Sequence, residues 1–358
     1  MIKGQFLVAT INMLKYMKPN NIYFFLLLIV FTCLIACKKE SSEKERFNAY
    51  LNDDLNDTSW SNNNTLGSGF MEKIFESTAI NPYLDSINAE NNTTINLPGN
   101  IAIDFPKNGY QEMNGSNLTN GTIHIAAYSL SKKGDLIKFI QSTTHRGTLF
   151  ENLGIFCIRA YKDNKELLLA KNSKITIRFS NNKNSAGQDI KLFTGVENPT
   201  PLLSNHHYFN FSWDEQKDGV EIKTYPNGSP GNNTSTGFEV TTNKLNWIGV
   251  GKPLENTNFS ASFAVVLPLN FTNKNTMVFA VLDETNTVAQ LSSNFSGRAF
   301  TIDHFPSNKK FTLLSISKIG KDFYFDSRIN NVASNNAAYK LNPSKVTLSY
   351  ISSILDNL

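Results

Sequence analysis

The stretch GIFCIRAYK, residues 154 to 162, indicates the fold class of this 358-residue chain. β-Branched and aromatic residues recur in it with the alternation expected of a strand. Similar runs lie between residues 94 and 319, separated by turns rich in Asn, Gly, Ser and Lys. Many short strands without long helical patterns between them predict an all-β fold built from antiparallel β-sandwiches.

Helical patterns are confined to two of the later segments. The first is SKKGDLIKF, residues 131 to 139, and the second is NPSKVTLSYISSILDNL at the C-terminus. In the second segment residues 342 to 344 form a helix start signal, and Val346, Tyr350 and Ile354 recur on one face. The sequence therefore predicts a short C-terminal helix after the strands.

The strand region is long enough for two domains, because single hydrophobic cores stop growing at about 250 to 300 residues. We place the division in the polar, proline-containing stretch 195 to 205. The predicted organisation is a leader (1–36), Cys37 with a tether and short helical linker (37–92), a first β-sandwich (93–198), and a second β-sandwich with the C-terminal helix (199–358).

Charge gives little indication of a partner. Hydrophobic residues make up 40% of the chain, charged residues make up 18%, and the formal net charge is +4. Lys3, Lys15 and Lys18 supply three of these positive charges, so the chain from Cys37 onward is close to neutral. The other lysines form no basic stripe of the kind that follows phosphates, and nucleic-acid binding is not expected.

The apolar segment from Ile22 to Ala36 is typical of a secretion signal. It is preceded by Lys18, carries no charge and is short for a membrane-spanning helix. Residues 34 to 37, Leu-Ile-Ala-Cys, resemble the lipobox of bacterial lipoproteins. That resemblance implies a diacylglyceryl group on the Cys37 thiol and cleavage before it, which would anchor the chain without a spanning helix. We expect Met17 or Met13 to be the start residue, because Met17 gives a leader of ordinary length.

The residues that follow Cys37 indicate a location. Residues 38 to 45, KKESSEKE, are too polar to fold alone and are typical of a solvated tether. They resemble the charged stretch of Bacteroidetes-type lipoproteins, which is associated there with display on the outer face of the outer membrane. We therefore expect a lipid-anchored outer-membrane protein that is exposed at the cell surface.

The central region resembles a domain frequent in Bacteroidetes outer-membrane lipoproteins with tandem β-sandwiches. The resemblance rests on turn and core motifs and covers most of residues 90 to 328; it departs from that pattern at residues 107 to 110. The opening of the first domain also resembles the ZU5-type sandwich, an interaction module. The matching motifs are Asn114-Gly115, Thr119-Asn120-Gly121, Lys132 to Ile137, Thr143-Thr144, Leu149 to Gly154 and Lys174 to Ile177.

Five histidines limit the metal chemistry that the sequence can offer. The weak candidates for metal ligands are His206 and His207, with Asp214 nearby in sequence, and His304 next to Asp303. Adjacent residues on a strand point to opposite faces, so His206 and His207 would not easily share one ion. We expect surface histidines instead, and a solvated turn tip at residues 145 and 146.

Two further groups of residues could bind ligands. Tyr208, Trp213 and Trp247 could stack on sugars if their rings lie on an exposed face, although alternating aromatics on strands more often belong to a core. Asp283 and Glu284 could bind calcium, but two acids in a hairpin are usually soluble turn residues.

Cys33 leaves with the leader and Cys37 is acylated, so Cys157 has no intramolecular partner. We expect it to be a small buried hydrophobe.

No dinucleotide or phosphate-binding motif occurs, and we predict no cofactor. The expected role is structural, adhesive or binding and non-enzymatic. A surface carbohydrate-binding accessory protein or a metal-dependent hydrolase is the alternative, and a glycan or protein at the cell surface is the expected partner.

Replacing Cys37 with Ser should abolish lipid labelling and leave the precursor uncleaved, because both modifications act at this cysteine. Metabolic labelling with a fatty-acid analogue measures the result. A Cys33→Ser variant is the matched control and should label normally; label retained on the Cys37 variant would contradict the lipobox.

Overall fold

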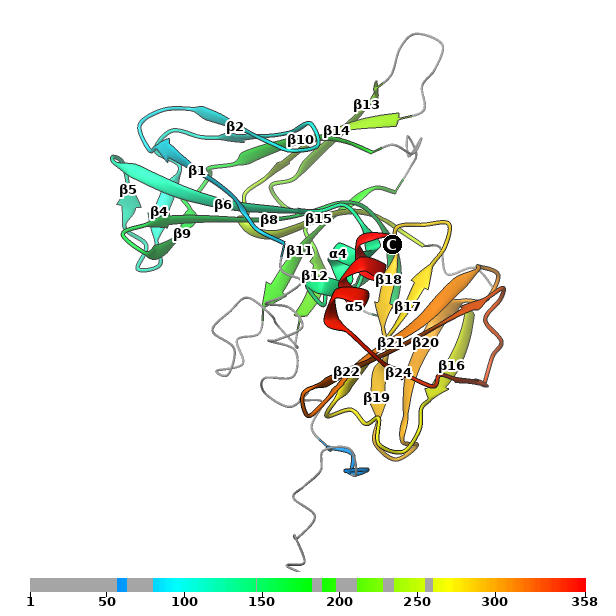
Figure 1. The fold of residues 1–358 in the computed structure, drawn as a ribbon. Helices are drawn as coiled ribbons and strands as arrows, with labels where there is room; N and C mark the ends of the chain where they lie inside the picture. Colours follow the sequence, from blue (N-terminus) through cyan, green and yellow to red (C-terminus); the bar gives the residue numbers. More distant parts are fainter. Residues whose placement is uncertain are drawn as a thin grey trace, which may run out of the picture. The chain divides into compact units, whose positions relative to one another are not determined.

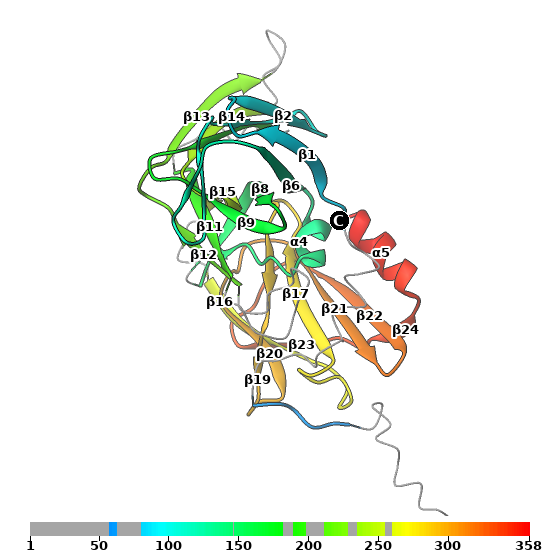
Figure 2. The same cartoon turned by 90° about the vertical axis from the view of Figure 1, so that its left-hand side faces the viewer.

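Four β-sheets form two sandwiches in this computed structural model (Figures 1 and 2). The structure describes residues 57–62, 80–145, 147–181, 189–197, 211–227, 235–254 and 260–358, all within one unit that begins at Asp57. Strands dominate these residues, and a single short helix lies at the C-terminal end. The predicted all-β fold is confirmed.

The first sandwich packs a ten-stranded sheet against a five-stranded sheet, and every strand pair in it is antiparallel. The larger sheet runs β12-β11-β15-β8-β9-β4-β5, with β6 and then β1 on the other edge of β8 and the short β7 pairing with the start of β8. The smaller sheet runs β13-β14-β10-β3-β2. The strands are β1 (Tyr83–Asn88), β2 (Thr93–Leu97), β3 (Ile101–Phe105), β4 (Tyr110–Glu112), β5 (Asn117–Leu118), β6 (Thr122–Leu130), β7 (Thr144–His145), β8 (Thr148–Lys162), β9 (Lys165–Leu169), β10 (Ile175–Asn181), β11 (Lys191–Glu197), β12 (Phe211–Glu215), β13 (Glu221–Asn227), β14 (Ser235–Thr242) and β15 (Asn246–Pro253).

Alternation along β10 shows why these runs form strands. Ile175, Ile177 and Phe179 are buried between the two sheets, whereas Thr176 and Arg178 face outward. An apolar face of this kind is stable only when it is covered by a second layer.

The second sandwich packs a four-stranded sheet, β19-β20-β16-β23, against a five-stranded sheet, β18-β17-β21-β22-β24. All of its pairs are antiparallel except β16 with β23, which is parallel. Its strands are β16 (Ser260–Val266), β17 (Thr276–Leu282), β18 (Val288–Gln290), β19 (Ser292–Asn294), β20 (Ala299–Pro306), β21 (Phe311–Ile319), β22 (Asp322–Asn330), β23 (Ala337–Lys340) and β24 (Ser344–Val346).

The predicted domain boundary between residues 198 and 199 does not separate the two sandwiches. β14 pairs with β10, and β15 pairs with β8, so strands from both sides of the boundary form the same two sheets. The chain changes sandwich after Pro253, before β16 begins at Ser260. The polar stretch 195 to 205 therefore interrupts the first sandwich rather than ending it. β1, which begins at Tyr83, also belongs to the first sandwich, although the prediction placed it in the linker.

A third hydrophobic core lies where the two sandwiches meet, and we call it the shared core. Sheet strands of both sandwiches and two helices contribute to it. Its buried members are Leu130, Leu136, Ile137, Phe139, Ile140, Phe150, Ile155, Cys157, Phe193, Trp213, Trp247, Met277, Phe279, Val281, Val288, Leu314, Ile316, Phe325, Ile351 and Leu355.

β17 shows how the shared core and the interior of the second sandwich are connected, because all seven of its residues are buried. Phe279 points into the shared core, whereas Val278 and Ala280 point into the second sandwich. A strand covered on both faces is expected to be continuously apolar, as TMVFAVL is.

β8 contributes to all three cores. Leu149 packs in the second sandwich, Phe150 and Ile155 pack in the shared core, and Phe156 packs in the first sandwich. Val250 and Gly251 of β15 face Gly154 and Asn152, so Leu153 is an extra residue in β8. Such a bulge reverses which face each later residue occupies, and this lets one strand serve several cores.

The two helices, α4 (Lys133–Lys138) and α5 (Leu348–Asp356), pack against each other beside the shared core (Figure 2). Backbone contact is so close that a Cβ on Gly134 would lie 1.7 Å from the Leu355 carbonyl oxygen. Lys138, which is almost fully buried, pairs with Asp356.

α5 begins later than predicted. Residues 344 to 346 form β24, and the helix starts after Thr347, whose hydroxyl accepts a hydrogen bond from the Tyr350 amide at 3.2 Å. Its buried residues are Ile351 and Leu355, while Tyr350 is exposed. The predicted face is therefore wrong at Val346, which pairs with β22 in a strand, and at Tyr350, whereas Ile354 is partly buried against the shared core.

α4 ends in a strained residue. The Gln141 amide bonds to the Leu136 carbonyl at 2.7 Å, which places Ile140 at the left-handed position that glycine usually occupies, with φ of 54°. This conformation costs about 1 to 2 kcal/mol for a residue with a Cβ. Ile140 is buried in the shared core, and that burial offsets the strain.

Replacing Gly134 with Ala should destabilise the protein by about 1 to 3 kcal/mol, because the new methyl group overpacks the contact between α4 and α5. Urea unfolding measures the change. Ser353→Ala, on the exposed side of α5, is the control and should change stability by no more than about 0.5 kcal/mol. Equal stability of the two variants would show that the helices can separate freely.

Candidate functional site

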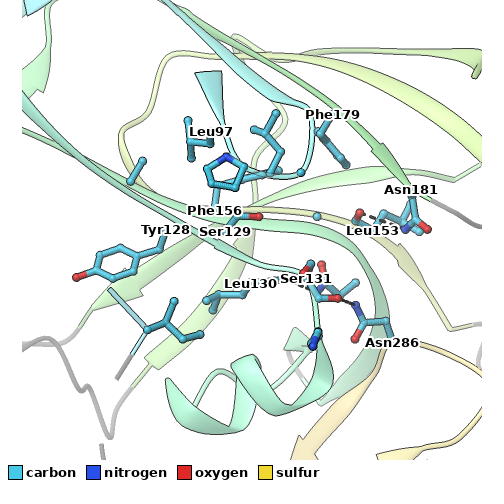
Figure 3. Close-up of a pocket in the computed structure, with 18 of the residues that line it drawn as sticks. Leu97, Tyr128, Ser129, Leu130, Ser131, Leu153, Phe156, Phe179, Asn181 and Asn286 are labelled. Atoms are coloured by element: carbon cyan, nitrogen blue, oxygen red, sulfur yellow. Dashed lines mark hydrogen bonds between the residues drawn. The ribbon is translucent and has the colours of Figure 1, made fainter. Parts of the chain in front are cut away.

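A groove lies where the two sandwiches meet, at the end of β6 (Figure 3). Its volume is about 1100 Å³. The first sandwich contributes the β2–β3 turn, the last residues of β6 and parts of β8 and β10, and the second sandwich contributes the β17–β18 turn. The residues discussed below are Tyr83, Pro98, Asn100, Tyr128, Ser129, Leu130, Ser131, Lys132, Lys133, Glu151, Asn152, Phe179, Asn181, Asp283 and Asn286.

Local turn chemistry sets the rim of the groove. Gly99 and Asn100 both have left-handed φ, 84° and 57°, which closes the short turn between β2 and β3. Asparagine and glycine are the residues that adopt this conformation at least cost. Pro98 and Asn100 are consequently exposed at the rim.

Two asparagine side chains, one from each sandwich, fix the seam beside the groove. Asn152 Nδ2 donates to the Leu130 carbonyl at 3.1 Å, and Asn286 Nδ2 donates to the Ser131 carbonyl at 2.9 Å. The Asn152 amide also donates to the Asn286 carbonyl at 2.9 Å. The first and second sandwiches are therefore joined by directional bonds as well as by the shared core.

These bonds also determine which way the two carboxamides point. Backbone carbonyls only accept hydrogen bonds, so each NH₂ group must face its carbonyl. The Oδ1 atoms of Asn152 and Asn286 are then left buried without a partner among the residues that the structure describes. Buried acceptors of this kind ordinarily bind an ordered water or a ligand donor.

The charged groups of the groove are already engaged. Lys132 Nζ donates to the Asp356 carbonyl at 3.1 Å, and Lys133 Nζ donates to the carbonyls of Leu282 and Asp283 at 2.5 and 2.9 Å. The Asp283 carboxylate lies 3.5 Å from Lys310 Nζ. The groove thus offers amide and hydroxyl groups rather than a concentrated charge.

The predicted aromatic platform is corrected by the structure for both of its tryptophans. Trp213 and Trp247 are 1% and 2% exposed and belong to the shared core. A Cβ on Gly249 would lie 3.0 Å from the Trp213 ring, so the glycine gives that ring room against the sheet. Trp213 Nε1 donates to the Ser142 carbonyl at 2.9 Å, which satisfies its polar atom. Tyr208 lies outside the described residues.

The predicted metal candidates are not brought together in the described part of the chain. His206, His207 and the lipidation residue Cys37 lie outside it. His304 is exposed, with φ of 57°, at a bulge where Asp303 and His304 lie opposite Ser262. Within the described ranges no group of three His, Cys, Asp or Glu side chains could hold an ion.

The two acids of the β17–β18 turn, which were candidates for calcium binding, each pair with a lysine instead. Asp283 pairs with Lys310, and Glu284 Oε2 lies 3.1 Å from Lys309 Nζ. These contacts fit the ordinary role of acids in a soluble hairpin turn.

His145 was expected at a solvated turn tip, but it is half-buried. Its Nδ1 lies 2.6 Å from the Trp213 carbonyl, and its ring packs against Phe193 with centroids 5.4 Å apart. The short β7 strand draws it inward by pairing with β8. Cys157 is buried on β8, as predicted, and its Sγ donates to Asn246 Oδ1 at 3.5 Å.

The tether region also has a defined contact, because residues 57 to 62 bind the second sandwich. Lys274 Nζ lies 3.0 Å from Asp57 Oδ2, and Asn273 exchanges two hydrogen bonds with the Ser61 backbone at 2.8 and 2.9 Å. Arg298 donates to the Thr58 carbonyl at 2.5 Å, and Trp60 packs on Phe300 with ring centroids 5.2 Å apart. We call residues 57 to 62 the strap.

Sequence reasoning did not identify the groove or the strap. Asn152 offered a signal, since a carboxamide in the apolar run LFENLGIF is a polar group at a buried strand position. The strap lies more than 200 residues from its partners in the sequence, and no local pattern reports such a pairing.

No helix in the described ranges is long and apolar enough to cross a bilayer. Comparison with known proteins gives no family: no protein-family model matches the chain, and no curated protein sequence is significantly similar to it. The functional argument therefore rests on the residues themselves.

The strap should loosen in acid. Hydrogen bonds from the Ser59 side chain and backbone, together with Lys274, lower the pKa of Asp57 from 3.8 to about 2. A depressed carboxyl pKa stabilises the folded state above pH 3.8, and this stabilisation is lost as the pH falls toward 2. The hydrogen-exchange protection factors of residues 58 to 62, which compare the measured rates with the intrinsic rates at the same pH, should fall across this range.

Asp57→Asn should remove most of that pH dependence, while Asp85→Asn, at a partly exposed position of β1, should leave it intact. An unchanged acid response in the Asp57 variant would contradict this origin.

Proposed function

We propose that this protein is a lipid-anchored, non-enzymatic binding component of the outer membrane, displayed at the cell surface on a rigid two-sandwich body. The lipobox at residues 34 to 37 and the charged stretch after it support the anchor and the location. The observation that carries the proposal is the shared core, to which strands of both sandwiches contribute.

Rigidity follows from the residues that fill this core. Phe150 and Phe193 stack with centroids 4.4 Å apart, and Trp213 packs edge-on against Phe150 at 6.0 Å. Met277 and Phe279 of the second sandwich belong to the same cluster. Large apolar interfaces restrict relative domain motion, whereas small polar ones permit it.

The strap supports a role for the second sandwich as the part of the protein to which the tether is attached. The chain leads from Cys37 through a polar tether and then binds Lys274, Asn273 and Arg298. On this proposal the tether attaches to the second sandwich through the strap. The shared core then fixes the groove relative to both sandwiches.

A carbohydrate-binding accessory role is the second candidate, and one observation favours it. The groove is lined by carboxamide and hydroxyl groups, and hydrogen bonds to backbone carbonyls hold the Asn152 and Asn286 carboxamides in place. Ligand sites commonly place a few fixed polar groups among apolar walls.

Surface display is tested by changing the three glutamates at positions 40, 43 and 45 to Ala in cells. We expect protease shaving of whole cells to degrade the wild type and to spare this variant, with lipid labelling unchanged in both. Changing Lys38, Lys39 and Lys44 to Ala is the matched control and should leave the protein accessible. Equal accessibility of the glutamate variant would show that the acids are only a spacer, and a wild type that resists shaving would contradict surface display.

A further inference from the structure

We infer that the groove at the end of β6 binds a neutral, hydroxyl-rich ligand, a short glycan by its chemistry. The inference rests on the proposed binding function and names the ligand class of that function. The site differs from the aromatic platform expected from the sequence, whose two tryptophans are buried.

The size of the groove suits several sugar rings. Its volume of about 1100 Å³ is slightly above the usual range for small-molecule sites, roughly 300 to 1000 Å³. Both sandwiches line it, so a ligand there would contact the seam rather than one sheet alone.

The polar groups determine the ligand class. Buried Oδ1 atoms of Asn152 and Asn286 lack a donor among the described residues, and Ser129 adds a hydroxyl to the lining. Both atoms are buried beside the groove, and unfilled acceptors there favour O–H donors, above all a buried water that relays a ligand hydroxyl.

The charges argue against an anionic ligand. Lys132 and Lys133 direct their ammonium groups to backbone carbonyls, and Glu151 and Asp283 add two acids to the lining. A phosphate or sulfate site would instead present converging N–H donors or free cations.

The walls supply apolar surface for sugar rings. Tyr83 and Tyr128 are partly exposed and line the groove, together with the exposed Pro98. Aromatic rings with one polar end suit a surface that is partly apolar and partly wet.

The test presents the full mature chain, in detergent, to an array of neutral glucose-, mannose-, galactose- and N-acetylglucosamine-based oligosaccharides beside sulfated and uronic-acid oligosaccharides. We expect binding among the neutral set. Titration calorimetry with the best neutral oligosaccharide then compares variants. Ser129→Phe should weaken binding at least tenfold by filling the groove. Ser327→Phe, at an exposed position of β22 outside the groove, should bind as the wild type does.

A second variant guards against misfolding. Asn100→Gly keeps the left-handed turn while removing a rim side chain, and it should weaken binding several-fold with an unchanged melting temperature. Binding only to acidic oligosaccharides, binding to none, or equal binding by wild type, Ser129→Phe and Asn100→Gly would overturn the inference. A crystal structure soaked with the neutral oligosaccharide that shows no sugar in the groove, neither in direct contact with Asn152 and Asn286 nor bonded to them through a water, would also overturn it. The surface-display proposal is tested separately. It would stand after any of these outcomes if the protein is still labelled with lipid and still degraded by protease on whole cells.

Discussion

Burial of one aromatic cluster between two sheets is the constraint on which the rest of this structure depends. Trp213 and Trp247 from the first sandwich meet Met277 and Phe279 from the second, and α4 and α5 cover the cluster from the side. A sheet face this apolar cannot be left in water, since fully burying each large side chain is worth about 1.5 to 3 kcal/mol. Each sandwich therefore needs the other to complete its burial.

Several local features follow from that constraint. β8 carries a bulge at Leu153 that lets it face three cores in turn, and Gly134 permits helix backbones to touch. Ile140 is held in a left-handed conformation because its side chain fills the shared core. The same junction brings Asn152 and Asn286 to the seam, where their carboxamides hold the backbone beside the groove.

The sequence predicted those parts of the structure that local patterns encode. Alternation in ITIRF and continuous apolar character in TMVFAVL both indicate strands. The burial of Cys157 could be predicted because it lies in the apolar and aromatic run GIFCIRAYK. The domain boundary could not be predicted, because β15 returns to pair with β8 across a polar stretch and such pairings leave no local trace. The groove was missed for the same reason, since Asn152 and Asn286 come from different sandwiches.

Calorimetric unfolding of the purified protein tests the central claim most directly, because two sandwiches that complete one another's burial should unfold together. We predict a single transition whose calorimetric and van't Hoff enthalpies agree, at the melting temperature reported by the fluorescence of the buried tryptophans. Two resolved transitions, with the tryptophan signal changing only in one of them while the other sandwich stays folded, would contradict the account.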